Sequence, residues 1–210
     1  MKITVAALEK KGFTLVQKLP HQDLIPFVKM YIGKKNPYTR FYYGFTLVGL
    51  IALAAWIGFI AAKDFLSASD IFQHLSFGLA IPLALLPLHE GLHGFAYKRV
   101  GAPRVAYKAN WKQFYFMAVA DQFVVNRREL NFVAVLPFAV ISFACLLGLF
   151  FVPIAWQITL LSSMVLHAGM CGGDFSIMSY FYEHKHEEVV TYDDVPNGIS
   201  YFYHRPINFT

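Results

Sequence analysis

The stretch Ile71–Val100, IFQHLSFGLAIPLALLPLHEGLHGFAYKRV, decides how this chain folds and which chemistry it can carry. Its apolar run is long enough for a helix that crosses a bilayer, and it ends in the motif His89-Glu90-Gly91-Leu92-His93. Residues four apart share one face of a helix, so His89 and His93 can both direct a ring nitrogen at one metal ion, with Glu90 beside it. This spacing is typical of zinc hydrolases.

The position of Glu90 strengthens this interpretation, because it is the only formally charged residue between Asp70 and Lys98. A charge in an apolar segment of this length costs a few kcal/mol on insertion into a membrane, so it usually faces a cavity or a partner and has a function. The simpler interpretation is a chance match, or two histidines that are hydrogen-bonded inside a helix bundle. The isolated charge favours a metal site.

The composition predicts a membrane protein with a single domain. Of its 210 residues, 57% are hydrophobic and 15% are charged, whereas about a quarter are charged in a typical soluble domain. The net charge of +5 could suggest nucleic acid, but the basic residues flank apolar runs instead of forming one stripe. Lipid headgroups of the bilayer explain them better, so we expect no nucleic-acid partner.

Charge-free runs give the fold class, an all-α membrane protein with about four transmembrane helices. The predicted spans cover about residues 41–62, 71–97, 130–151 and 154–181, each long enough to cross the hydrocarbon core. Pro82 and Pro87 should kink the second span just before the histidines.

The sequence divides into a membrane domain and two flanking segments. Residues 41–182 form the membrane domain, residues 1–40 a cytosolic or interfacial segment, and residues 183–210 a cytosolic tail. Gln22–Lys35 mixes apolar residues with lysines, which suits a segment at the membrane surface. An ordinary cytosolic loop with a short helix is an equally good interpretation.

A short β-hairpin at the cytosolic membrane surface is expected between the second and third spans. Arg104–Ala109 and Phe114–Val125 are rich in Val, Phe and Tyr, and Asn110–Gln113 could form the turn. The alternative is a third hydrophobic helix over Phe114–Ala120.

Basic residues predict the orientation. Four precede the first span and seven lie between the second and third, against one and none in the other two loops. Since cytoplasmic loops carry the excess of Lys and Arg, both termini should face the cytosol.

Asp174 is the candidate for a third metal ligand, because it is the only formal charge between Glu129 and Glu183. His89 and Asp174 each lie roughly 30 Å along a helix that runs towards the cytosol, so the two can meet. His167 is the rival ligand; it lies about 10 Å deeper and is favoured as a packed histidine or a support for a ligand. His74, His184 and His186 are excluded as primary ligands.

Small residues precede Asp174 in HAGMCGGDF. Gly169, Gly172 and Gly173 are expected to let another helix approach closely.

These motifs together carry a resemblance. A helix with HExxH, a basic segment rich in strand-forming residues, and a last span with a lone Asp after small residues resemble the site-2-protease class of intramembrane zinc metalloproteases. The sequence motifs LHEGLHGF and GGD most resemble those of the zincin peptidase family of bacterial membrane proteins. The resemblance covers about Ile71–Tyr182.

The resemblance implies one zinc ion bound by His89, His93 and Asp174, with Glu90 as the catalytic base. It also implies cleavage of a peptide bond in a membrane-associated protein or peptide, within or near a bacterial inner membrane. The better-studied proteases carry an Asn-Pro segment and a Gly after the ligand Asp; here Phe175 follows Asp174 and no Asn-Pro precedes it. Substrate gating and oxyanion contacts therefore do not transfer.

Two other functions fit the same residues. One is a non-catalytic membrane protein that binds a metal or a client through a zincin-like fold. The other is a metal carrier that uses His89, His93, His167 and Asp174 as a relay.

Overall fold

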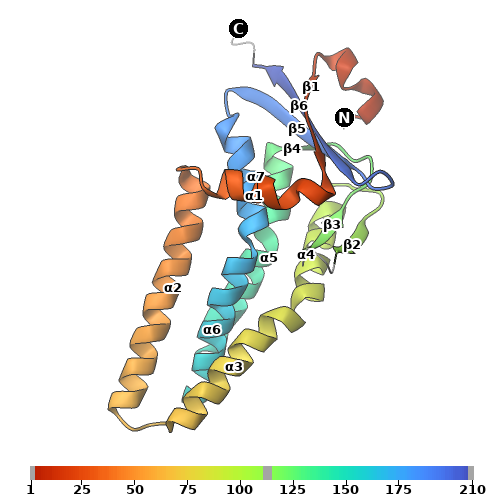
Figure 1. Ribbon diagram of the computed structural model, residues 1–210. Coiled ribbons are helices and arrows are strands. Elements are labelled where there is room, and N and C mark those ends of the chain that lie inside the picture. Colours follow the sequence, from red (N-terminus) through yellow and green to blue (C-terminus); the bar gives the residue numbers. More distant parts are fainter. Residues whose placement is uncertain (1–2, 111–114, 208–210) are drawn as a thin grey trace.

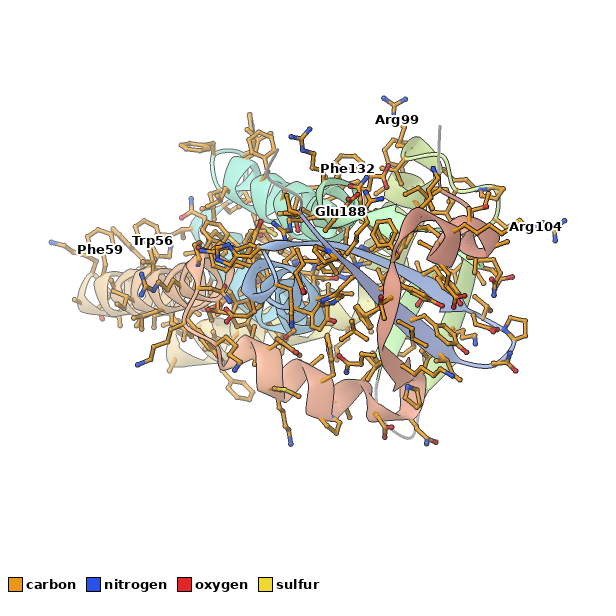
Figure 2. The ribbon with its side chains drawn as sticks, turned by 90° about the horizontal axis from the view of Figure 1, so that it is seen from above. Trp56, Phe59, Arg99, Arg104, Phe132 and Glu188 are labelled. Carbon is orange, nitrogen blue, oxygen red and sulfur yellow. The ribbon has the colours of Figure 1, made fainter. Side chains whose placement is uncertain are left out.

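A bundle of long helices carries a β-sheet at one end, and the loop between α2 and α3 lies at the opposite end (Figure 1). The computed structural model describes residues 3–110 and 115–207. Seen from the sheet end, α1 and the sheet lie over part of the bundle, the helix with Trp56 and Phe59 extends beyond them, and Arg99 and Arg104 point outward (Figure 2). Both arginines are exposed.

Helix α2 spans Pro37–Ala62 and α5 spans Arg127–Gly148. Each begins at an asparagine that forms a capping box: the side chains of Asn36 and Asn126 accept hydrogen bonds from the first-turn N–H groups. These caps satisfy backbone donors that have no partner within the helix. They fix where each apolar helix begins.

Helices α3, Ala68–Ala84, and α4, Leu86–Arg99, form the second long helical run and are separated by Leu85. The expected kink is confirmed: Pro82 lies inside α3 and a proline, Pro87, lies in the first turn of α4. A proline inside a helix removes one hydrogen bond and clashes with the preceding turn, whereas in the first turn it costs little. The helix is therefore broken just before His89.

The last apolar run is also broken, which the sequence did not predict. One helix was expected over residues 154–181, but the structure has α6, Ile154–Met170, and α7, Gly172–Glu183, bent by 45° at the break. Gly172 and Gly173 follow Cys171 directly. Glycine has a low helix propensity, and small residues such as these are common at sharp bends.

Three helical runs of the described chain are long and apolar enough to cross a membrane, and α6 with α7 makes a fourth if the bent pair is one span. Many of their large apolar side chains are exposed, including Val48, Phe72, Phe143 and Leu147. An apolar surface of this kind suits contact with lipid better than with water.

Close helix packing occurs around α6, at glycines other than those expected. A Cβ added at Gly78 of α3 would lie 1.7 Å from Ser162 Oγ, and one at Gly49 of α2 would lie 2.8 Å from a Val165 methyl. By contrast, a Cβ at Gly169 or Gly173 would meet nothing within 4 Å. The expected close approach is therefore wrong at these two glycines, while a Cβ at Gly172 would lie 3.4 Å from the Tyr42 hydroxyl of α2, an ordinary contact distance.

The principal sheet contains four antiparallel strands in the order β1-β6-β5-β4. These strands are β1, Thr14–Pro20; β4, Val125–Asn126; β5, Glu187–Asp194; and β6, Ile199–Pro206. The chain is mostly helical, but the expectation of an all-α fold was wrong in this part. Residues before α2 and after α7 pair with each other here, a long-range partnership that no local pattern shows.

The hairpin between the second and third helical runs is confirmed, with β2, Ala106–Asn110, paired to β3, Tyr115–Val119. A helix over Phe114–Ala120, the alternative, is therefore wrong for its described part. Of the predicted turn, Asn110–Gln113, residues 111–113 lie outside the described residues.

The segment before α2 contains short 3-10 turns and helix α1. The turns cover Val5–Ala7, Glu9–Lys11 and His21–Asp23, and α1 covers Leu24–Ile32. Helix α1 lies across α7: the Phe27 ring is 5.6 Å from that of Tyr180 and 5.8 Å from that of Phe202 in β6. This aromatic core joins the sheet to the bundle.

Candidate metal centre

The break at Leu85 places His89, Glu90 and His93 in the first turns of α4, where all three side chains are buried. One helical turn separates the histidines, as their spacing predicted. Their Nε2 atoms lie 3.1 Å apart. The two rings therefore direct the same kind of nitrogen at one point.

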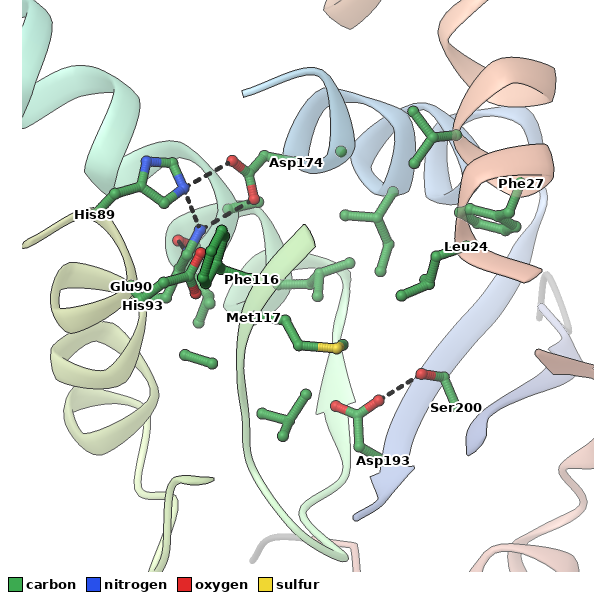
Figure 3. A pocket seen from close by; sticks show the side chains of 18 of the residues that line it. Leu24, Phe27, His89, Glu90, His93, Phe116, Met117, Asp174, Asp193 and Ser200 are labelled. Carbon is green, nitrogen blue, oxygen red and sulfur yellow. Dashed lines mark hydrogen bonds and ion pairs between the residues drawn. The ribbon is translucent and has the colours of Figure 1, made fainter. Parts of the chain in front are cut away.

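Asp174 reaches this point from the first turn of α7. Its Oδ1 lies 3.1 Å from His93 Nε2 and its Oδ2 lies 3.6 Å from His89 Nε2 (Figure 3). The three residues offer ligand atoms that all lie within 4.8 Å of one another. The structure thus brings together the two histidines and the aspartate that the sequence singled out.

The other ring nitrogens hold the imidazoles in place. His93 Nδ1 is 2.9 Å from the Val133 carbonyl, which can only accept, so this nitrogen carries the proton. A neutral His93 then presents the lone pair of Nε2 towards Asp174. A backbone contact of this kind is what fixes the tautomer of a metal-binding histidine.

His167 contacts His89 from the opposite side. Its Nε2 lies 3.1 Å from His89 Nδ1, away from the nitrogen that faces Asp174. This position suits a residue that orients the His89 ring. His89, His167 and Cys171 also form a second group whose ligand atoms lie within 4.8 Å, so the geometry keeps His167 available as a rival ligand.

Cys171 was not singled out by the sequence argument. It is a free, fully buried cysteine at the break between α6 and α7, with Sγ 4.0 Å from the His167 ring nitrogens. The only sequence signal was its position beside His167 and Asp174. The structure puts it next to the residue that supports His89.

Glu90 lies beside the three converging side chains. The backbone N–H of Ala118, in β3, donates to its carboxylate. Its Oε2 is buried and has no hydrogen-bond partner among the described residues. A buried carboxylate oxygen without a partner is costly and normally has a functional reason.

A cavity of about 610 Å³ extends from this centre to the sheet. Its residues come from helices α1 and α3 to α7, from β3 of the hairpin, and from β1, β5 and β6 of the sheet. They include the four centre residues His89, Glu90, His93 and Asp174, and the polar residues Lys29, Tyr97, Asp193 and Ser200. An apolar wall is formed by residues that include Leu19, Leu24, Phe27, Phe116, Met117, Ala118, Val119, Leu130, Val133, Ile177 and Phe202. The volume is that of a typical small-ligand site, which is also enough for a few peptide residues.

The polar residues Asp193 and Ser200 lie away from the centre, with Met117 between (Figure 3). Ser200 Oγ donates to Asp193 Oδ1 over 2.5 Å, and His21 Nε2 lies 3.9 Å from the same oxygen. Burial raises the pKa of Asp193 to about 6 and lowers the pKa of His21 to about 4. Sequence reasoning missed this group, because polar residues in a polar tail resemble a solvated surface.

A family model described as "Putative zincin peptidase" matches residues 83–189, about half of the chain. The chain belongs to this family. The match begins just before the break at Leu85 and contains Glu90, the two histidines and Asp174. Searches of curated proteins and of solved structures found no match. Membership of the zincin peptidase family indicates a metallopeptidase and implies zinc.

The converging residues fit the zinc that the family implies. Two imidazole nitrogens and one carboxylate form a common donor set for catalytic zinc, which leaves the fourth position open. The buried Glu90 Oε2 is the second sign of fit, since it has no hydrogen-bond partner in the part of the chain that the structure describes. The residues present are therefore suitable for one zinc site of the zincin type.

The raised pKa of Asp193 predicts how stability depends on pH. The folded protein holds this proton up to about pH 6, whereas the unfolded chain releases it near pH 3.8. The contribution of the Asp193 carboxyl group to the stability of the folded state therefore decreases as pH rises from about 4 to 6. Asp193→Asn, which removes the charge, should melt at a higher temperature than the unsubstituted protein at pH 8, and this gain should shrink below pH 6.

Thermal melts of both proteins in detergent at pH 5 to 8 measure this effect. Asp194→Asn is the matched control, because Asp194 is the next residue and hydrogen bonds from Asn197 lower its pKa. This control should show no gain at pH 8. A lower melting temperature for Asp193→Asn than for the unsubstituted protein at pH 8 would contradict the assignment.

Proposed function

We propose that this protein is a zinc-dependent endopeptidase embedded in the membrane, which cleaves a peptide bond of a membrane-associated protein within or near the bilayer. The finding that supports it most is the meeting of His89, His93 and Asp174 beside the Glu90 carboxylate, whose Oε2 has no hydrogen-bond partner among the described residues. The cavity and the apolar helices around this centre support the location of the substrate. Zinc bound there would polarise the scissile carbonyl and lower the pKa of a water molecule towards 7.

Glu90 is the general base and acid in this proposal. Its free Oε2 takes a proton from the attacking water as the oxygen forms a bond to the carbonyl carbon. The same oxygen then passes the proton to the leaving amine as the C–N bond breaks. The hydrogen bond from Ala118 N–H keeps the carboxylate turned towards the cavity.

The β2–β3 hairpin is suited to hold the substrate. Within the described chain β3 pairs with β2 alone, and residues 116–119 of β3 line the cavity. An extended segment added beside β3 would run past Glu90, which contacts the strand at Ala118. Strand addition exposes a peptide bond that a helix would keep hydrogen-bonded.

The orientation proposed is that the sheet, the hairpin and both termini lie on the cytosolic side of a bacterial inner membrane. It is supported by the excess of basic residues beside the sheet end of the helices. Reporter fusions at residues 66 and 110 measure it: the fusion at 66 should report the outer side and the fusion at 110 the cytosol. A periplasmic signal at 110 would reverse the orientation.

The ligand set is tested by metal content. His89→Ala, His93→Ala and Asp174→Ala should each lose most of the bound zinc, because each removes one of three ligands. His167→Ala should retain zinc with affinity reduced about 10- to 100-fold, as expected for a residue that orients a ligand. His74→Ala is the control, since His74 instead contacts Thr159 Oγ1.

Zinc is quantified in each purified variant, and the melting temperature shows whether it folds. Full retention in Asp174→Ala together with loss in His167→Ala would move the third ligand position to His167. Such a result would favour the group that contains Cys171.

The role of Glu90 is tested by Glu90→Gln, which is nearly isosteric. The variant should keep zinc and fold but lose about 10²- to 10⁴-fold in turnover, the usual contribution of general acid–base catalysis. The measurement is cleavage of single-span membrane proteins in reconstituted vesicles, with a zinc chelator as a second control. Unchanged cleavage would remove Glu90 from the mechanism. No cleavage by the unsubstituted protein would favour the non-catalytic alternative.

A further inference from the structure

The end of the cavity that lies against the sheet has a fixed carboxylate that the proposed catalysis does not use. Asp193 of β5 and Ser200 of β6 both line the cavity. The Ser200 hydroxyl donates a hydrogen bond to Asp193 Oδ1, and the backbone carbonyl of Asp193 accepts a hydrogen bond from Gln122 N–H over 2.8 Å. Side chain and backbone are thus both held, so the carboxylate has a defined position.

No cation of the described chain forms an ion pair with this carboxylate. His21 is near enough, but with a pKa of about 4 it is neutral at pH 7. Lys108 adds some positive charge, yet its Nζ donates to the Val195 carbonyl. Asp121 adds negative charge, and its Oδ1 accepts from Val195 N–H. Lys29 of α1 also lines the cavity, but it forms no ion pair with Asp193 within the described residues. Two carboxylates, Asp193 and Asp121, thus face one neighbouring cation, Lys108, so the field around Asp193 is negative.

An apolar wall separates this carboxylate from the centre. Met117 lies between the two polar ends, and Leu24 and Phe27 line the side of the cavity formed by α1 (Figure 3). A peptide in the cavity would meet a metal-binding end, then an apolar stretch, then a carboxylate. A peptide that fits this order of surfaces needs apolar side chains beside the scissile bond and, beyond them, a group that a carboxylate can bind.

We propose that Asp193 binds a cationic group of the substrate, which sets specificity, while the apolar wall holds neighbouring apolar side chains. The proposal rests on the proposed function. A positioned carboxylate that the protein leaves unneutralised repels anions and gains from a cation that is desolvated beside it. Membrane proteins carry Lys and Arg next to the cytosolic ends of their spans. A substrate whose apolar span remains in the bilayer would place such a residue near this end.

The experiment measures peptide binding apart from cleavage, with zinc-loaded Glu90→Gln protein in detergent. The probes are fluorescent apolar peptides with an acetylated N-terminus and one Lys, which is moved along the peptide in steps of one residue. In matched peptides norleucine or Glu replaces that Lys. A further peptide without Lys has a free α-amine, which distinguishes a terminal ammonium from a side chain.

We expect the Lys peptide, in at least one position, to bind about tenfold or more tightly than its norleucine partner, and the Glu peptide to bind more weakly still. Asp193→Asn should remove this difference, Ser200→Ala should reduce it, and Asp194→Asn should leave it intact. If the free α-amine alone gives the gain, the cation is the substrate's N-terminus. Zinc content and melting temperature confirm that each variant is folded.

Equal binding of the Lys, norleucine and Glu peptides at every position would overturn the proposal, as would a Lys preference that survives in Asp193→Asn. Absence of binding by every peptide also counts against it. Failure of the proposed function is a different result: it is seen as a lack of cleavage by the protein with Glu90 intact, or as a lack of zinc.

Discussion

The contact of Asp174 with His89 and His93 depends on two breaks in otherwise long apolar helices. At Leu85 the chain begins a new helix, so the histidines lie in its first turns; at Cys171 the chain bends by 45°, and Asp174 follows within the next turn. Burying three polar side chains together is costly unless they pair or bind a cation. The two helix breaks bring the side chains of His89, His93 and Asp174 into contact.

The sheet forms the wall of the cavity opposite this centre. Strand β1 supplies Leu19 and strand β6 supplies Ser200 and Phe202, while α1 adds Leu24 and Phe27. The same Phe27 and Phe202 rings pack on Tyr180 of α7. One aromatic cluster thus holds the helix that carries Asp174 and closes the space beside it.

Local features were predictable from the sequence. Charge-free runs gave the ranges of the long helices, Pro82 and Pro87 gave the kink, and the motif gave two histidines on one face. The hairpin followed from strand-forming residues. The isolation of Asp174 in an apolar run was enough to single it out, because such a charge rarely lacks a partner.

Features that depend on distant partners were not predictable. The pairing of β1 with β6 joins segments separated by most of the chain, so neither one reveals the other. Gly172 and Gly173 are compatible with close packing and with a bend, and packing against another helix was the wrong choice for Gly173. Asp193 resembled a surface residue because only the folded sheet turns it towards the cavity.

The β1–β6 pairing also affects the order in which the chain can assemble during synthesis. Residues 14–20 leave the ribosome early, but their partner strand is residues 199–206. Until that strand exists, β1 lacks its neighbour, and the cavity lacks the wall that Phe202 and Ser200 provide. The helices and the metal-binding residues are all made before this step. A chain interrupted before residue 199 would therefore hold the chemical groups of the centre without the enclosed space beside them.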